Sequence, residues 1–317
     1  MVGTTLVDER SRERIAAAIR SRRLDVAGAV FRAGVQLALV LALSVIIVLL
    51  YTTVRDGWDQ LGTRLGDFLS GTLRSRAGDD RLGVHQGLYG TFWIAVSVAV
   101  FAFPLGIAAA IYLEEYAPRN RLTAFIELNI RNLAGVPSVV YGLLGLFLFV
   151  KGIPGITGGG SVLSAGLTMS ILVLPIVVIT ASEAIRAVPD SLREGGYGVG
   201  ATRWDTIRTL VLPSAAPGIL TGTLLAMSRA VGEAAPLILV GALTGRVGKN
   251  PALLDVSSLT ERFTAMPIVI TGWTQQAGRD AGFAAAAAAA IVVLLVFVLL
   301  LNSLAIVARN HFERKRG

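Results

Sequence analysis

The chain has 317 residues, of which 54% are hydrophobic and 16% are charged. A soluble protein of this length carries about 25% charged residues, so the composition is typical of a membrane protein with several spans. The net charge of +8 does not indicate a nucleic-acid partner, because membrane proteins gather Lys and Arg on their cytoplasmic side. Cysteine is absent, which excludes disulfides and thiolate metal sites, and we expect this chain to bind no metal and no cofactor.

Six apolar runs are long enough to cross a bilayer as helices, which takes about 20 residues each. They lie near residues 33–54, 87–113, 122–150, 162–182, 215–242 and 283–307. No small-residue cleavage site follows the first run, so it is interpreted as a retained span. The sequence therefore predicts an all-α, polytopic fold with six transmembrane helices and a transmembrane domain over residues 33–308.

Basic residues gather in three polar segments. Residues 1–32 hold seven arginines, and the stretch ERIAAAIRSRR within them is either an interfacial helix or a disordered tail. Residues 309–317 and the loop 183–213 hold four basic residues each. With six spans all three segments lie on one face, so we expect the loop and both termini to be cytoplasmic.

The third run contains a proline that interrupts helical hydrogen bonding. Pro137 follows Arg131 and Asn132, so the membrane entry is expected near Leu133. Exposed carbonyls at such a break are tolerated only beside protein or a cavity. Asn132 and Ser138 could therefore supply hydrogen-bond donors to a substrate, and a plain kink is the alternative.

The fifth run contains a charged pair, Arg229 and Glu233, at a spacing of four residues. Counting from Ala215 places Arg229 about 21 Å along the helix, at or past the middle of the bilayer. Charges at that depth usually face a bundle interior or an aqueous path. The pair is either a structural ion pair or part of a substrate path, in which the guanidinium binds an oxyanion.

Small residues in the fifth and sixth runs favour close helix packing. Gly218 and Gly222 form G-x-x-x-G, and residues 284–290 are all alanine. Such residues let membrane helices approach one another, although alanine is also merely tolerated in lipid.

The loop 183–213 is polar but has the signals of ordered structure. Pro189 is expected to end the preceding helix, and Ser191 and Glu194 have the spacing of a capping box at a new helix start. Trp204 begins a helical periodicity, and Pro213 is expected to close the segment. Several glycines between these points allow tight turns and close backbone approach.

The sequence of this loop resembles a cytoplasmic loop of the membrane subunits of ATP-binding-cassette importers, whose pattern is E-A-A-x3-G-x9-I-x-L-P. All spacings agree, with glycine in place of both alanines and leucine in place of isoleucine. The matching residues are Glu194, Gly195, Gly196, Gly200, Leu210, Leu212 and Pro213. The resemblance implies the type I importer permease fold and a loop that docks on a separate ATPase, with Ser191 and Trp204 on the docking segment.

Three segments together are similar to permease subunits of phosphate-specific importers of the PstA type. They are NLAGVPSVVYGLLGL, the P-D-S-L-R-E-x-x-Y-x-x-G form of the loop, and SRAVGEAAPLILVG. The resemblance implies transport of inorganic phosphate by alternating access in a bacterial inner membrane. It also implies a second homologous permease, an ATPase dimer that uses ATP and Mg, and an extracytoplasmic phosphate-binding protein.

The chain is not expected to be an enzyme. No Walker motif occurs, and the nearest stretch, GRVGKN, lacks both the spacing and the Ser or Thr. The main alternative is a permease of the same fold for another oxyanion or a small polar solute. An intramembrane enzyme would need a nucleophile and a base at membrane depth, and a passive channel has no use for this loop.

Overall fold

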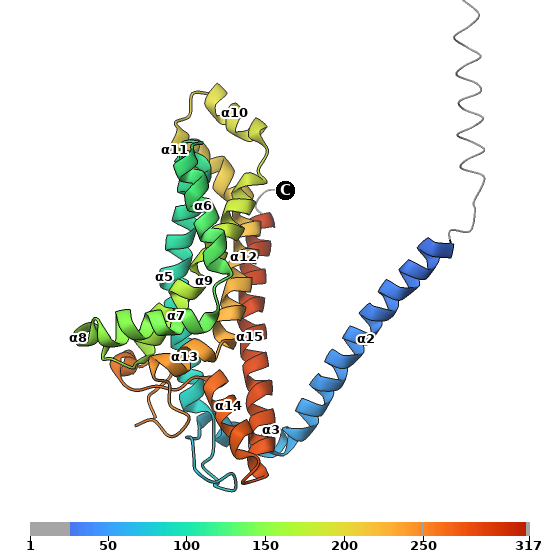
Figure 1. Cartoon of the computed structure of the whole chain (residues 1–317), viewed down its shortest axis with the longest axis vertical. Coiled ribbons are helices and arrows are strands. Elements are labelled where there is room, and N and C mark those ends of the chain that lie inside the picture. Colours follow the sequence, from blue (N-terminus) through green and yellow to red (C-terminus); the bar gives the residue numbers. More distant parts are fainter. Residues whose placement is uncertain (1–25, 249, 315–317) are drawn as a thin grey trace, which may run out of the picture. The chain divides into compact units, whose positions relative to one another are not determined.

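The structure is a computed structural model that describes residues 26–248 and 250–314 (Figure 1). The described residues form helices and no β-strand, apart from one isolated bridge between Thr72 and Leu82. The chain divides into two compact units, residues 1–52 and 53–317. The all-α fold is confirmed. Residues 1–25 lie outside the described part, so the choice between an interfacial helix and a tail stays open.

The first unit is dominated by helix α2, Val26–Asp56. Its apolar segment, Gly28–Asp56, is 29 residues long with a mean hydropathy of 2.7. That length and hydropathy are sufficient for one membrane span, so the first predicted span is confirmed.

The second unit is a bundle built around α9, Val162–Arg186. Helix α9 packs most extensively against α5, His85–Ile111, and α12, Leu212–Gly232. Helix α15, Gly282–Arg314, packs along α12. The predicted spans near residues 87–113, 162–182 and 283–307 are confirmed. The core between these helices is rich in small and branched apolar residues, including Val98, Ala165, Val173 and Ala226.

Small residues permit the close helix contacts, as expected. A Cβ at Gly222 of α12 would come within 2.1 Å of the Thr180 hydroxyl oxygen on α9, and one at Gly218 within 2.7 Å of the Ala184 Cβ. On α15, the backbone of Ala289 lies 2.7 Å from a Cβ placed at Gly57. The G-x-x-x-G pair and the alanine run are therefore packing surfaces rather than residues tolerated in lipid.

The third predicted span is broken. Helix α6, Arg121–Ala134, and the pair α7–η2, Ser138–Gly145 and Leu146–Lys151, meet at an angle of 99°. Pro137 explains the break, because proline cannot donate a helical hydrogen bond and disfavours helical geometry in the residue before it. The described residues thus hold five straight candidate spans, or six if the bent pair counts as one.

The fifth predicted span was wrong at both ends. One continuous apolar helix runs from Arg203 to Gly232, through α11 (Arg203–Thr206), the π-helical η3 (Ile207–Val211) and α12. Pro213 therefore does not close the loop. The helix continues through Pro213 because a π turn precedes it, in which the Leu212 N–H donates to Ile207 O five residues earlier. The helix ends at Gly232, and a short helix α13, Ala235–Val240, follows.

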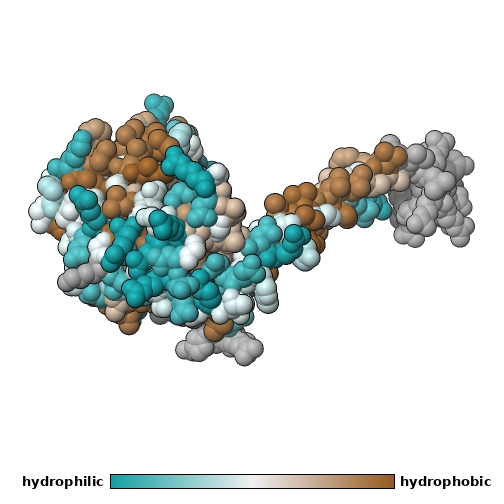
Figure 2. Space-filling model, turned by 90° about the horizontal axis from the view of Figure 1, so that it is seen from below, coloured by the Kyte–Doolittle hydropathy of each residue, from teal (hydrophilic) through white to brown (hydrophobic). Residues whose placement is uncertain are grey.

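The remaining described helices lie in the connecting segments. They are α3 (Trp58–Thr63), α4 (Leu65–Ser70), η1 (Tyr112–Tyr116), α8 (Pro154–Thr157), α10 (Asp190–Gly198), η4 (Ser257–Thr260) and α14 (Met266–Gln276). A second core joins α4, α14 and α15 through Phe68, Trp273 and Phe283. This core lies at the end of the bundle opposite α10, and α15 finishes at the α10 end (Figure 1). Figure 2 views the end opposite α10, where hydrophilic residues gather.

Candidate functional site

Helix α10 forms the exposed tip of the bundle, and most of the predicted docking residues lie on it or next to it. Ser191, Glu194 and Gly195 are exposed, as is Trp204 in the following helix. Large apolar residues stand beside Glu194, and Val199 is 85% exposed. Leu212 and Pro213 lie apart from this surface, since they are half-buried in the first turn of α12.

The capping box predicted at the start of α10 was wrong. Helix α10 begins at Asp190 after Pro189, and no side chain caps it. Ser191 is the second helical residue, so its hydroxyl is not at the capping position. The preceding helix does end before Pro189, with Ala187 as its cap. The cap that the structure does contain is one element later, where the Thr202 hydroxyl accepts a hydrogen bond from the Asp205 N–H.

The glycines of the loop have separate roles. Gly200 has φ +83°, a conformation that favours glycine, and it turns the chain between α10 and α11. Gly196 is buried against Thr206 and Leu210, whereas Gly195 faces open space. The match to the importer loop thus contains one position that requires glycine for its backbone and one where packing leaves no room for a side chain.

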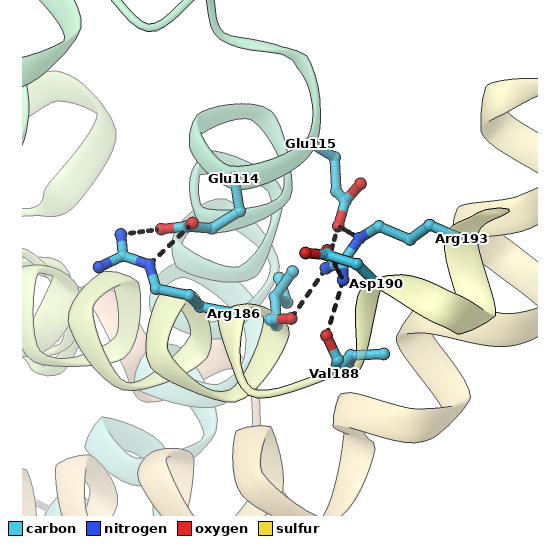
Figure 3. Close-up of polar contacts among 7 residues, drawn as sticks. Glu114, Glu115, Arg186, Val188, Asp190 and Arg193 are labelled. Carbon is cyan, nitrogen blue, oxygen red and sulfur yellow. Dashed lines mark hydrogen bonds and ion pairs between the residues drawn. The ribbon is translucent and has the colours of Figure 1, made fainter.

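Arg193 connects α10 to the end of α5, a contact that the sequence analysis missed (Figure 3). Its Nε and Nη2 donate to Glu115 Oε1 at 3.1 and 2.8 Å, and its other donors reach Val188 O, Ile185 O and Asp190. The side chains of Arg193 and Glu115 are 17% and 5% exposed. Burial alone would lower the pKa of Arg193, but hydrogen bonding to Glu115 and the charge of that residue raise it above its usual value. The guanidinium therefore stays charged.

A second pair lies beside the first. The Arg186 guanidinium, at the end of α9, donates to both carboxylate oxygens of Glu114 at 2.7 and 3.2 Å (Figure 3). Both glutamates belong to η1, the π turn that extends α5. The sequence carried one signal for these contacts, since two adjacent acids directly follow an apolar run and a nearby loop on the same face is rich in arginine.

Arg229 and Glu233 lie within ion-pair distance of each other, but at a different depth from the one expected. Their Nε and Oε1 atoms are 3.5 Å apart, and the side chains are 43% and 24% exposed. The helix both begins and ends earlier than predicted, at Arg203 and Gly232. Arg229 therefore lies in its last turn rather than near its middle. Glu233 follows directly after the helix, in an extended conformation. A pair this exposed and this loosely joined contributes little stability.

Asn132 and Ser138 flank the break in the third span. Ser138 is the first residue of α7, and the Asn132 carbonyl accepts a hydrogen bond from the Gly135 N–H. The Leu133 carbonyl at the break accepts from the Val136 N–H at 3.1 Å and from the Tyr141 hydroxyl at 2.9 Å.

The two broken helices meet at α7 and α13. A Cβ at Gly142 of α7 would lie 2.7 Å from the Cα of Pro236 in α13. The structure thus brings the helices that follow the two breaks, α7 and α13, into contact. Among the described residues, no group of three or more His, Cys, Asp or Glu side chains could hold a metal ion.

The bundle of apolar helices, with a polar helix exposed at one end, defines a multi-pass membrane protein. Residues 102–316 match the family described as binding-protein-dependent transport system inner membrane component, and the chain belongs to this family.

Curated relatives include two groups of phosphate permeases. The chain is 40% identical over 206 residues to the phosphate transport system permease protein PstA 1 of Mycobacterium tuberculosis (strain CDC 1551 / Oshkosh), which covers 64% of this chain and 65% of that protein. It is 29% identical over 268 residues to PstC of Mesorhizobium japonicum, covering 77% and 81%. The probable ABC transporter permease protein YqgI of Bacillus subtilis is 37% identical over 51% of this chain. The chain spans 54% of the length of YqgI and 65% of the length of PstA 1.

Solved importer structures share the fold. A bacterial ABC transporter involved in the import of the acidic polysaccharide alginate matches 92% of this chain and 98% of its own, with a TM-score of 0.57 and 17% identity. The MetNI methionine ABC transporter in an inward-facing conformation matches 71% and 94%, with a TM-score of 0.51 and 16% identity. The expected importer permease fold is therefore confirmed.

Proposed function

We propose that this chain is the permease subunit of an ATP-driven importer of inorganic phosphate. The observation that carries the proposal is the exposed helix α10, which presents the Glu194-Gly195-Gly196 pattern at one end of the bundle. Polar and apolar side chains are interleaved on this surface, which suits a protein partner better than lipid. In this proposal α10 is the coupling helix, and a separate ATPase dimer that uses ATP and Mg docks on it.

The other partners follow from the family. A second homologous permease would complete the translocation path, because relatives of two kinds, PstA and PstC, match this chain. An extracytoplasmic phosphate-binding protein would deliver the anion to the opposite end. One structure of the bacterial alginate ABC transporter contains a periplasmic protein bound to an alginate pentasaccharide, which supports this proposal. The site of action is the bacterial inner membrane, with α10 and both tails, 1–32 and 309–317, in the cytoplasm.

Phosphate is the substrate that the chemistry favours. Arg229 keeps almost half of its side chain exposed at a helix break, and a guanidinium matches an oxyanion through two parallel hydrogen bonds. Glu233, Asn132 and Ser138 would line the same path and orient the anion. The competing proposal is another oxyanion or a small polar solute, because the family and the solved neighbours include transporters named for other solutes.

Charge reversal at Glu194 tests the coupling proposal. We expect Glu194→Lys to insert normally, to bind the ATPase weakly or hydrolyse ATP without transport, and to lose phosphate uptake in proteoliposomes. Asp59→Lys, which reverses an exposed charge on α3 at the opposite end, is the matched control and should transport normally. Normal uptake by Glu194→Lys would argue against docking at α10. Competition by sulfate and other anions in the same uptake measurement separates phosphate from the alternative solutes.

A further inference from the structure

Helix α5 holds a loop at its outer end. Four side chains from its first three turns contact the backbone of the segment between α13 and α14. His85 Nε2 lies 2.7 Å from Pro251 O, Gln86 Oε1 accepts from Val247 N at 3.2 Å, Tyr89 Oη donates to Asp255 O at 2.6 Å, and Trp93 Nε1 donates to Leu253 O at 2.9 Å. The backbone of this segment therefore contacts one face of α5 at Val247 and within residues 250–255.

At its other end α5 extends into η1, which contacts both α10 and α9. Glu115 of η1 accepts two hydrogen bonds from Arg193 of α10, and Glu114 accepts two from Arg186 at the end of α9. The two pairs differ in exposure, since the Arg193 side chain is 17% exposed and that of Arg186 is 53% exposed. An ion pair that is largely buried and joined by two hydrogen bonds is costly to separate, because separation leaves an uncompensated charge. The Glu115–Arg193 pair, which holds α10, is consequently harder to separate than the Glu114–Arg186 pair, which holds α9.

The contacts with the loop and the contact with α10 are made by the two ends of one continuous helix. The segment His85–Tyr116 has 32 residues, which corresponds to about 48 Å along the axis. Pro104 lies within α5, but the helix continues through it to Ile111, and α5 packs more extensively against α9 than against any other described helix. We infer that α5 shifts as a unit more readily than it bends. A displacement of α10 is thereby carried to the loop at the far end of the bundle.

We propose that Glu115 and Arg193 are positioning residues that join the coupling helix to α5, and that α5 carries its movement to the loop residues 250–255. The inference rests on the proposed function, in which an ATPase moves α10. The Glu114–Arg186 pair is the natural comparison, because it has the same chemistry one residue away but is more exposed.

The test uses the assembled importer in proteoliposomes, with phosphate uptake and ATP hydrolysis measured together. Glu115→Gln should assemble and keep its basal hydrolysis, while the phosphate taken up per ATP falls at least tenfold. Glu114→Gln, the matched control, should change this ratio less than threefold. A wild-type ratio in Glu115→Gln would overturn the inference. If the wild-type complex itself shows no ATP-dependent uptake, the proposed function fails instead.

A chemical crosslink keeps the test decisive if Glu115→Gln does not assemble. The chain has no cysteine, so Glu115→Cys combined with Arg193→Cys creates the only thiols of this subunit. With cysteine-free partners, a reversible bifunctional thiol reagent added after assembly should restore the uptake per ATP at least fivefold. A reductant should abolish the gain. Uptake that does not respond to the crosslink would overturn the role of this contact.

Discussion

Gly196 in α10 lies so close to Thr206 in α11 that a Cβ at position 196 would come within 2.7 Å of the threonine hydroxyl oxygen. At the neighbouring Gly195 a Cβ would meet nothing within 4 Å. These two glycines replace the two alanines of the importer loop pattern, so the structure distinguishes two departures that are identical in sequence.

We expect Gly195→Ala to be tolerated and Gly196→Ala to be harmful. Alanine at 195 should stabilise α10 by up to about 1 kcal/mol, because glycine is a poor helix former. At 196 the clash should cost about 1 to 3 kcal/mol, which outweighs the same gain. Thermal unfolding in detergent and phosphate uptake would measure both effects.

A second substitution provides the control for the clash. Thr206 Oγ1 is buried and has no hydrogen-bond partner among the described residues, so Thr206→Ala should cost little. The double variant Gly196→Ala with Thr206→Ala should therefore regain most of the lost stability. If it does not, Gly196 is required for a reason other than the space beside Thr206.

A similar contact joins the membrane helices. We expect Gly222→Ala to weaken the packing of α12 on α9, because the new Cβ would meet the side chain of Thr180. The cost should be about 1 to 3 kcal/mol, seen as a lower unfolding temperature of the purified protein. Removing the opposing side chain as well, as Gly222→Ala with Thr180→Gly, should recover part of the lost stability. An unchanged melting temperature in the single variant would contradict this packing.

Arg229 can be separated from its acidic neighbour by mutation. If it only neutralises Glu233, removal of both charges, as Arg229→Met with Glu233→Gln, should restore transport lost in either single variant. We expect instead that the double variant assembles but stays inactive, because the anion loses its guanidinium. A charge-assisted hydrogen bond contributes about 1.5 to 3 kcal/mol, so uptake should fall roughly 10- to 100-fold.

Lysine provides a further comparison at this position. Arg229→Lys should also transport poorly, because lysine keeps the charge but loses the planar fork. Arg279→Met, which removes an exposed arginine between α14 and α15, is the control and should transport normally. Near wild-type uptake by the double variant at 229 and 233 would leave Arg229 as a structural ion pair.

The topology can be tested with single cysteines, since the chain has none of its own. Asn310→Cys, at an exposed residue near the end of α15, should react with an impermeant thiol reagent only from the cytoplasmic side. Asn250→Cys, at the opposite end, should react only from outside. Labelling of position 310 from outside the cell would reverse the proposed orientation of α10.

Apolar runs were enough to predict most of the spans but not their interruptions. Helices α5, α9 and α15 lie where their runs predict them, because continuous apolarity over this length leaves few alternatives. The break at Pro137 was visible as a proline, but its 99° angle depends on how α7 packs on α13. Pro213 was predicted to end the loop segment, but the π turn before it lets the helix continue.

The candidate site was predictable only where it is local in sequence. The pattern from Glu194 to Pro213 identified the loop, and the four-residue spacing of Arg229 and Glu233 allowed the ion pair that the structure contains. The pair between Glu115 and Arg193 joins residues 78 positions apart. Neither side chain belongs to a recognisable motif with the other, so only the packing of α5, α9 and α10 brings them together.

The length of the continuous helix Arg203–Gly232 bears on how far α10 lies from the hydrocarbon core of the bilayer. Its 30 residues extend about 45 Å, and α5 with η1 is about as long, whereas the hydrocarbon core is about 30 Å thick. Glu114, Glu115 and their arginines would be costly in hydrocarbon, so in the proposed importer we expect the excess length to project at that end. We then expect α10 to stand about 10 to 15 Å outside the hydrocarbon, beyond most of the lipid headgroups. A water-soluble protein could press against α10 without displacing lipid, and a projection one turn shorter would sink that surface about 5 Å toward the headgroups.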